Sequence, residues 1–252
     1  MKTVAFSMQK GGSGKTSVSV SVAAELAKQG DTLLVDADPQ GNATAWIGPD
    51  EISKELAGVL FEEYKVEAAI VKTQTPGLWL LPSAGQGGNL KKFIERGAAD
   101  SPFCIQALAD EASGLGFRYM VIDLSPAFGT FERCAVIAAD EVVTPVTPEQ
   151  FCLDGLRIFG ENLADARKKL RSGKPVYNKL VVTALNKSFK RHMGLFRMLK
   201  ESVSWMKVYV IPQDQIFGNV QVLRQTVQAT GAAKAETLEA IELLAKDLTE
   251  VA

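Results

Sequence analysis

The segment Lys10–Thr16, with the sequence KGGSGKT, constrains the fold of this chain more than any other. It follows an apolar run at 3–8 that is typical of a buried strand. It precedes residues 17–28, whose apolar side chains recur at helical spacing. A glycine-rich turn between a strand and a helix is the context in which a phosphate-binding loop forms, because backbone N–H groups and the helix N-terminus converge on phosphate oxygens. The sequence therefore predicts an α/β protein with a P-loop NTPase fold.

Two lysines distinguish this loop from an ordinary glycine turn. Lys15 is expected to lie along the β- and γ-phosphates of a nucleotide, and the Thr16 hydroxyl is expected to bind Mg²⁺. The usual pattern, G-x-x-x-x-G-K-[ST], has a glycine where this chain has Gln9, and a second lysine, Lys10, stands beside it. A dinucleotide-binding fingerprint is excluded because Ser17 stands where its third glycine belongs. The residues predicted to hold the phosphates are Lys10, Gly11, Gly12, Ser13, Gly14, Lys15, Thr16 and Ser17.

Three aspartates follow predicted strands. Asp36 and Asp38 come after the apolar run 32–35, and Asp123 comes after 119–122. Ligands of open α/β sheets bind beyond the carboxyl ends of the strands, where one carboxylate can support a Mg²⁺ shell and another can orient a water. The alternative, that the first two aspartates only cap the strand end and the next turn, stays open. A buried strand-end aspartate without a cation is costly, so Asp123 is expected to hold Mg²⁺ through a water.

These motifs together resemble the ParA/MinD family of P-loop ATPases, which have a deviant Walker A loop. The KGGSGKT segment resembles that loop, residues 35–44 (VDADPQGNAT) resemble the first switch, and residues 119–123 (YMVID) resemble the Walker B strand. The resemblance implies that Asp38 positions the attacking water and that Asp36 supports the Mg²⁺ shell. It also implies that ATP and Mg²⁺ are the cofactors, and that Lys10 reaches the phosphates of a second subunit.

One departure from the family's pattern follows the Walker B aspartate. The family usually has a proline pair there, whereas this chain reads Leu124-Ser125-Pro126. The shape of the second switch, which we place at 124–132, is therefore open.

The nucleotide base is expected at the ends of two later strands, 180–185 and 208–212. Asn186 follows the first strand, and the resemblance implies that it contacts the adenine edge, although a role as a helix N-cap is an open alternative. Pro212 and Asp214 lie where the family commonly has Pro-Arg-Asn, so backbone groups there are expected to frame the base. The missing arginine removes a residue often linked to DNA contact.

Length and composition suit one ATPase domain spanning 1–252, since the chain has 252 residues and is 46% apolar. Strands alternate with helices, which predicts a mainly parallel sheet with helices on both faces. A longer amphipathic helical region is predicted over 49–75. With no membrane-spanning run, no room for a signal peptide and no C-x-x-C pair, a cytoplasmic protein with reduced cysteines is expected.

The net charge of −1 hides a strongly basic stretch. Residues 166–200 contain eleven Lys or Arg and no acidic residue, a split that points to a polyanionic partner. Nothing there suggests base reading, so phosphate contacts of low sequence specificity are expected. Part of the stretch, 167–171, is equally well explained as a solvated helix face. The predicted DNA-binding residues are Lys187, Lys190, Arg191, Arg197, Lys200 and, further along, Arg224.

Three functions compete: a DNA partition ATPase, a membrane-associated positioning ATPase like MinD, and a metabolic or redox relative such as the nitrogenase iron protein. The membrane reading is disfavoured because 236–252 carries five acidic residues against Lys246 alone. The redox reading is disfavoured because no cysteine lies in a glycine-rich ligand loop. The resemblance implies an ATP-dependent homodimer that binds DNA nonspecifically in the nucleoid, releases it on hydrolysis, and responds to a ParB-like partner protein.

Overall fold

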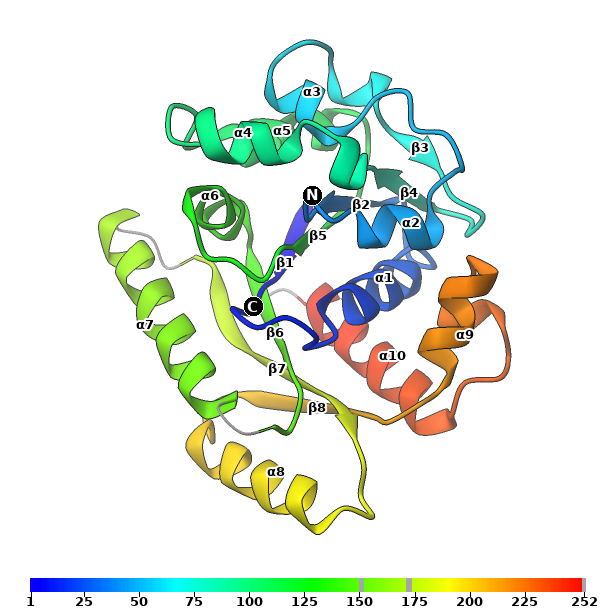
Figure 1. Ribbon diagram of the computed structural model, residues 1–252, viewed down its shortest axis with the longest axis vertical. Helices are drawn as coiled ribbons and strands as arrows, with labels where there is room; N and C mark the ends of the chain where they lie inside the picture. The colour runs from blue at the N-terminus through cyan, green and yellow to red at the C-terminus, as the bar shows by residue number, and fades with distance from the viewer. Residues whose placement is uncertain (150–151, 171–173, 251–252) are drawn as a thin grey trace.

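The computed structural model describes residues 1–149, 152–170 and 174–250, which form an eight-stranded sheet flanked by helices (Figure 1). The strand order is β3-β4-β2-β5-β1-β6-β7-β8, and all neighbours run parallel except β3 and β4. The predicted mainly parallel α/β sheet is confirmed. The strands are β1 (Lys2–Phe6), β2 (Thr32–Ala37), β3 (Val71–Lys72), β4 (Leu78–Leu81), β5 (Tyr119–Leu124), β6 (Glu141–Val146), β7 (Val176–Leu185) and β8 (Lys207–Pro212).

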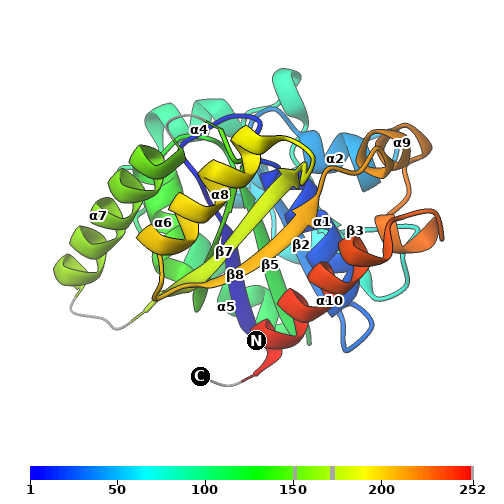
Figure 2. The same cartoon turned by 90° about the horizontal axis from the view of Figure 1, so that it is seen from below.

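Helices cover both faces of the sheet, as Figure 2 shows. One face carries α1 (Lys15–Leu26), α2 (Asn42–Ile47), α9 (Ile216–Leu223) and α10 (Ala235–Thr249). The other carries α3 (Leu56–Leu60), α4 (Leu90–Arg96), α5 (Cys104–Gly114), α6 (Thr130–Ala138), α7 (Cys152–Leu170) and α8 (Lys190–Ser202). Three short 3₁₀ helices, η1 (Val66–Ala68), η2 (Gly85–Gly87) and η3 (Val227–Ala229), complete the described elements.

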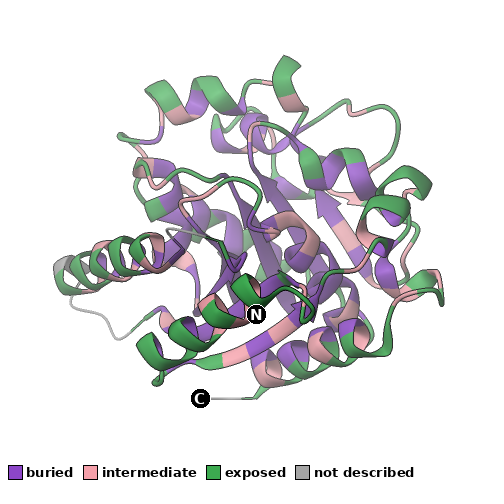
Figure 3. Cartoon of the chain, turned by 60° about the horizontal axis from the view of Figure 1, so that its bottom comes forward, coloured by how far each residue is buried: buried purple, intermediate pink, exposed green. Residues whose placement is uncertain are grey.

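Two hydrophobic cores lie on the two faces of the sheet, because successive side chains of a strand point to opposite faces. In β1, Val4 and Phe6 pack into the core beneath α1 and α10, while Ala5 packs into the core beneath α5 to α7. All three are fully buried. The central strands are consequently almost continuously apolar, and the buried sheet stands out between the exposed outer faces of the helices in Figure 3.

The long helical region predicted over 49–75 is wrong. The structure divides it into α3, η1 and the short strand β3. Glu62 adopts a φ of 60°, in the left-handed region, directly after the end of α3, and a helix cannot continue through that conformation. Leu56 and Leu60 are nevertheless buried. The sequence also predicts a long helix over 148–170. The structure describes this helix, α7, from Cys152 on, and residues 150–151 lie outside the described residues.

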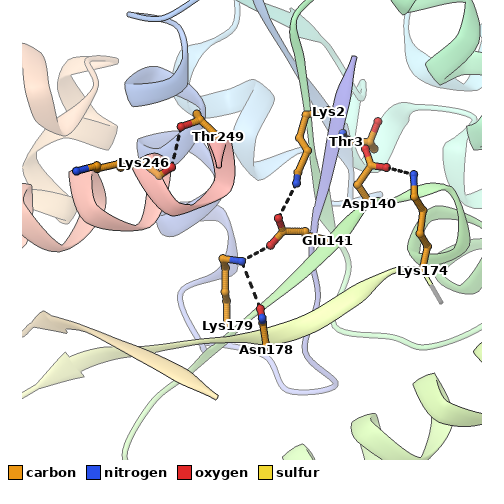
Figure 4. Close-up of polar contacts among 9 residues, drawn as sticks. All are labelled: Lys2, Thr3, Asp140, Glu141, Lys174, Asn178, Lys179, Lys246 and Thr249. Carbon is orange, nitrogen blue, oxygen red and sulfur yellow. Dashed lines mark hydrogen bonds and ion pairs between the residues drawn. The ribbon is translucent and has the colours of Figure 1, made fainter. Parts of the chain in front are cut away.

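A buried ion cluster joins β1, β6 and β7 near their amino ends (Figure 4). The Glu141 side chain is only 2% exposed, and its Oε1 accepts a hydrogen bond from Lys2 Nζ at 2.6 Å. Its Oε2 pairs with Nζ of Lys179, a lysine whose side chain is 10% exposed. Asn178 Oδ1 accepts a further bond from the same lysine at 3.3 Å. One carboxylate therefore compensates two cations, one of them almost fully buried.

We expect Glu141→Ala to lower the free energy of unfolding by about 3–5 kcal/mol, because it leaves Lys179 buried without its anion. Urea unfolding measures the change. Lys246→Ala, which removes an exposed lysine drawn in the same view, should change stability by less than about 0.5 kcal/mol. The double variant Glu141→Leu/Lys179→Met should recover most of the loss. A loss no larger than that of Lys246→Ala would show that the cluster does not stabilise the fold.

Candidate functional site

The loop between β1 and α1 has the backbone geometry of a phosphate cradle. Gly12 and Gly14 adopt φ values of 71° and 83°, which L side chains rarely adopt. A Cβ at Gly14 would also lie only 3.1 Å from the Thr183 side chain. No side chain caps the N-terminus of α1, so its first-turn N–H groups are free to bind an anion. The loop predicted from the sequence is thus shaped for phosphate.

Thr183 fastens this loop to β7. Its Oγ1 donates to the Ser13 carbonyl oxygen at 2.8 Å, across 170 positions of sequence. The next residue, Ala184, has a φ of 53°, and the pairing of β7 with β8 is irregular between Val182 and Leu185. Sequence reasoning missed Thr183, since nothing in an apolar strand singles out a threonine that reaches a distant loop.

Lys15 is buried at the floor of the loop. Its Nζ donates to the Lys10 carbonyl oxygen at 3.1 Å. Burial lowers the pKa of Lys15, and the nearby carboxylates of Asp123 and Asp38 oppose that shift. The structure therefore brings the predicted phosphate-binding lysine together with two of the three predicted aspartates.

Asp36 and Asp123 lie side by side on β2 and β5 as paired residues, and both are fully buried. Asp36 Oδ2 accepts bonds from the N–H and the hydroxyl of Thr44, each at 2.7 Å. Burial raises the pKa of Asp36 to about 7, with a further rise from the charge of Asp123, while the Thr44 bonds oppose it. The two hydrogen bonds from Thr44 thus stabilise the buried charge of Asp36, one of these two neighbouring carboxylates.

Asp123 has no comparable anchor. Neither of its carboxylate oxygens has a hydrogen-bond partner among the described residues. Burial raises its pKa to about 6. The Thr16 and Ser19 hydroxyls lie near enough to oppose the rise, as does the charge of Lys15, but neither hydroxyl meets hydrogen-bond geometry with the carboxylate. A fully buried carboxylate without a hydrogen-bond partner is a favourable ligand for a cation, because the cation balances the buried negative charge.

These residues fit Mg²⁺ bound together with a phosphate. No group of three or more His, Cys, Asp or Glu within 1–149, 152–170 and 174–250 could hold a metal ion alone. Mg²⁺ characteristically uses one or two protein ligands and takes the rest from phosphate and water. Asp123 and the Thr16 hydroxyl, both predicted from the sequence, would supply such a donor set. Asp36, the third predicted metal residue, is hydrogen-bonded to Thr44.

Asp38 lies on the wall of a cavity of about 500 Å³ above the loop. Its side chain is nearly buried, and Oδ1 accepts a bond from Gln40 N at 2.9 Å. The cavity holds the phosphate loop and the predicted water-positioning carboxylate in one space. Further lining residues that the sequence did not predict are Gln40, Asn42, Ala45, Trp46, Pro126 and Gln221.

Lys10 is held within its own chain. Its Nζ forms an ion pair with Glu149 Oε2 at 2.6 Å, and the two side chains are 32% and 58% exposed. The hydrogen bond from Lys10 lowers the pKa of Glu149. Glu149 was not predicted, since it follows β6 and lies 139 positions from Lys10. The second lysine thus stands at the rim of the site, paired but accessible.

On the side of the expected base, Asn186 is already hydrogen-bonded. Its Nδ2 donates to Gln213 Oε1 and its Oδ1 accepts from Ser188 N, both at 2.9 Å. The alternative role as a helix N-cap is wrong, because the N-cap of α8 is Phe189. The bond to Gln213 fixes the orientation of the Asn186 amide.

The side chain of Asp214 is hydrogen-bonded within its own chain. Its carboxylate accepts bonds from Ile216 N, Lys234 N and the Thr237 hydroxyl at 2.9–3.2 Å, which fastens the starts of α9 and α10. That backbone groups at Asp214 frame the base therefore stays a prediction. The segment 212–214 borders a cavity of about 180 Å³ that the phosphate loop also lines.

The predicted DNA-binding residues separate into two groups. Lys190, Arg191, Arg197 and Lys200 are exposed on α8, of whose described residues only Leu199 is buried. Lys187 precedes that helix and pairs with Glu236 at 2.9 Å, and Arg224, at the end of α9, pairs with Asp50. The structure thus gathers four of the six candidates. Arg171 of the basic stretch lies outside the described residues.

Comparison with known proteins agrees with this geometry. A family model described as an AAA domain matches residues 1–174. Protein BBD21 of Borreliella burgdorferi, which is uncharacterized, is 33% identical over 229 residues, covering 90% of this chain and 91% of that protein. The sporulation initiation inhibitor Soj of Bacillus subtilis is 36% identical over 158 residues, 62% of each chain. The chromosome partitioning protein ParA of Caulobacter vibrioides is 33% identical over 159 residues, only 60% of its length.

Solved structures share the fold over nearly the whole chain. McdA of Cyanothece superposes with a TM-score of 0.85 at 21% identity, covering 99% of this chain and 100% of that one. MinD of Pyrococcus horikoshii, solved with Mg-ADP, gives 0.79 at 21% identity, covering 99% and 96%. A plasmid partition protein of Borrelia burgdorferi gives 0.73 at 22% identity, covering 97% and 99%. Together with the family match and the Soj and ParA alignments, these findings show that the chain belongs to the ParA/MinD family of P-loop ATPases.

Proposed function

We propose that this chain is a partition ATPase that binds ATP with Mg²⁺, forms a homodimer around the nucleotides, and holds DNA until hydrolysis. The observation that carries the nucleotide part is Asp123, a fully buried carboxylate without a partner beside Lys15 and the phosphate loop. In a bound cation–phosphate complex, the cation would balance the charge of Asp123 and the phosphate would balance the charge of Lys15. In support, structural neighbours were solved with Mg-ADP and with ATP.

The residues of the site divide the chemistry among them. Loop N–H groups and Lys15 hold the β- and γ-phosphates, and Thr16 and Asp123 hold Mg²⁺. The ion supplies charge neutralisation when bound. Asp38 accepts a hydrogen bond from a water and aims its oxygen at the γ-phosphorus. The bond from that phosphorus to the oxygen bridging the β-phosphate breaks as the water oxygen bonds to phosphorus. The proton that the water loses passes to an oxygen of the released phosphate, giving ADP and phosphate.

Lys10 acts across the dimer in this proposal. In the structure it neutralises Glu149 of its own chain, so dimerisation exchanges that contact for the phosphates of the second subunit. A half-exposed ion pair contributes at most about 1 kcal/mol to stability. Losing it therefore costs little compared with the free energy gained when Lys10 contacts a triphosphate in a closed interface.

The DNA surface is formed by α8. Within α8, Glu201 is the one acidic residue beside the basic Lys190, Arg191, Arg197 and Lys200. Phe189 and Met198 are more than half exposed beside them. Dimerisation places two such helices on one particle, which raises DNA affinity through multivalency. A ParB-like protein is the proposed stimulating partner, and the nucleoid is the proposed location.

The membrane-associated alternative receives less support. The apolar face of α10, which includes Ile241, Leu244 and Leu248, is fully buried against the rest of the chain, and α10 contacts α1 and β8. An amphipathic helix needs that face free to enter a bilayer. Among the described residues, no helix has the length and apolarity to cross a membrane.

We expect replacement of Lys190, Arg191 and Arg197 by Ala to weaken ATP-dependent DNA binding equally on two unrelated sequences. Each lost phosphate contact should flatten the slope of log K against log[salt] by about 1. DNA retention with ATP, with ADP and without nucleotide, at two or more salt concentrations, measures this. ATP hydrolysis without DNA should hardly change.

The matched control removes the same charge from another helix. Lys91, Lys92 and Arg96 are exposed on α4, and their replacement by Ala should leave DNA retention near the wild-type level. Equal losses in the two triple variants would mean that net charge, rather than the α8 surface, governs binding. Wild-type retention in the α8 variant would remove α8 from the proposal.

Lys10→Ala should preserve nucleotide binding by the monomer but lose ATP-induced dimers and stimulated hydrolysis. An arginine supplied in trans is worth about 10³–10⁵ in kcat, and a lysine acts similarly but less directionally. The deciding measurement mixes Lys10→Ala subunits with Asp38→Ala subunits. If Lys10 acts in trans, each mixed dimer has one complete site, and a random mixture should regain about a quarter of wild-type activity.

Glu149→Gln is the control for this test. It removes the intrachain partner but keeps Lys10, so its dimerisation should equal or exceed that of the wild type. No activity in demonstrated mixed dimers would show that Lys10 serves its own subunit.

A further inference from the structure

The loop that joins β5 to α6, residues 125–129, is tied at both ends to one buried carboxylate. Ser125 Oγ donates to Glu132 Oε1 at 2.5 Å, and Gly129 N donates to Glu132 Oε2 at 2.9 Å. Ala127 N adds a bond of 3.3 Å to Ser125 Oγ. Glu132 is 1% exposed and Ser125 is 7% exposed. Hydrogen bonds to a buried carboxylate are charge-assisted and strong, so this side chain fixes the path of the whole loop.

The tied loop forms part of the wall of the nucleotide cavity. Ser125 comes two residues after Asp123, at the carboxyl end of β5. Pro126 lines the cavity together with Lys15 and Asp38. A shift of the loop therefore moves the wall next to the groups proposed to act on the γ-phosphate, and leaves the phosphate loop itself in place.

Only half of this arrangement is an ordinary helix cap. Glu132 is the third residue of α6, and its bond to Gly129 N is the usual contact between that position and the N-cap backbone. The bond to Ser125 reaches four residues further back and caps nothing. A proline at position 125 would fix the backbone through its ring. With serine there, the restraint comes from the hydrogen bond to Glu132.

We propose that Glu132, acting through Ser125, is a positioning residue for ATP hydrolysis. The inference rests on the hydrolysis proposed above and assigns a role to the Leu-Ser-Pro departure from the family's pattern. Ser125 and Glu132 fix the position of the cavity wall near the γ-phosphate. The affinity for ATP instead depends on the glycine loop and on the cavity bordered by 212–214. Loss of the bond between Ser125 and Glu132 should consequently lower kcat and leave ATP affinity nearly unchanged.

Ser125→Ala is expected to lower kcat by about 10- to 100-fold, because small displacements of reacting groups have effects of that size. The dissociation constant for ATP should change by less than about 3-fold, which on the scale of 1.4 kcal/mol per tenfold is a minor loss of binding. Ser125→Thr, which keeps the hydroxyl, should restore most of the rate. Glu132→Leu should reduce kcat similarly, and the double variant should be no worse than the poorer single variant, since the two residues act as one unit.

Tyr64→Phe provides a control for stability. It removes a hydroxyl that bonds the backbone of Glu55 at 2.9 Å and that lines neither nucleotide cavity. It should lower thermal stability without lowering kcat. Parallel losses of ATP affinity and kcat in Ser125→Ala, or no rescue by Ser125→Thr, would overturn the positioning role.

Hydrogen exchange without nucleotide separates this inference from the proposed function. Ser125→Ala should speed exchange of the Ala127 and Gly129 amides, whatever the protein hydrolyses. A wild-type protein that hydrolyses no ATP would overturn the proposed function. Unchanged exchange of these amides in Ser125→Ala would overturn the coupling of Ser125 and Glu132.

Discussion

The site depends on two carboxylates that the sheet places side by side at full burial. β2 and β5 are parallel neighbours, and their register pairs Asp36 with Asp123 at full burial. Two like charges in that position disfavour each other, and burial raises both pKa values. Thr44 compensates the first carboxylate, while Lys15 is the nearby cation for the second. Asp123 nevertheless has no hydrogen-bond partner among the described residues, and this is the basis for the cation proposed there.

The phosphate loop lies near these carboxylates and is connected through β7 to the turn before α8. Glycines at positive φ shape the loop, and Thr183 ties the loop to β7. The same strand ends just before the turn that carries Asn186 and leads into α8. The phosphate cradle and the basic helix are thus joined by a short, hydrogen-bonded piece of chain. In the proposed function, this connection is the route by which nucleotide binding would affect the DNA surface.

The sequence allowed the fold class, the phosphate loop and the three strand-end aspartates to be predicted, because each depends on local pattern and on the polarity of parallel strands. What it did not reveal depends on contacts between distant segments. The indole of Trp46, for example, donates to the Gln225 carbonyl oxygen across 179 positions. The ion pairs of Lys187 and Arg224 likewise join segments far apart in sequence. The helix predicted over 49–75 was wrong because apolar spacing does not register the left-handed backbone of Glu62.

The central claim, that Asp123 is left uncompensated for a cation, is tested most directly by thermal unfolding of Asp123→Asn with and without Mg²⁺ and ATP. At pH 8 and without nucleotide, the variant should be at least as stable as the wild type, because a buried charge without a partner has been removed. That advantage should shrink as the pH falls through about 6, where wild-type Asp123 becomes neutral. The variant should also lose the Mg²⁺-dependent rise in Tm that ATP gives the wild type. A variant that is less stable without nucleotide and keeps the full Mg²⁺-dependent rise would contradict the account.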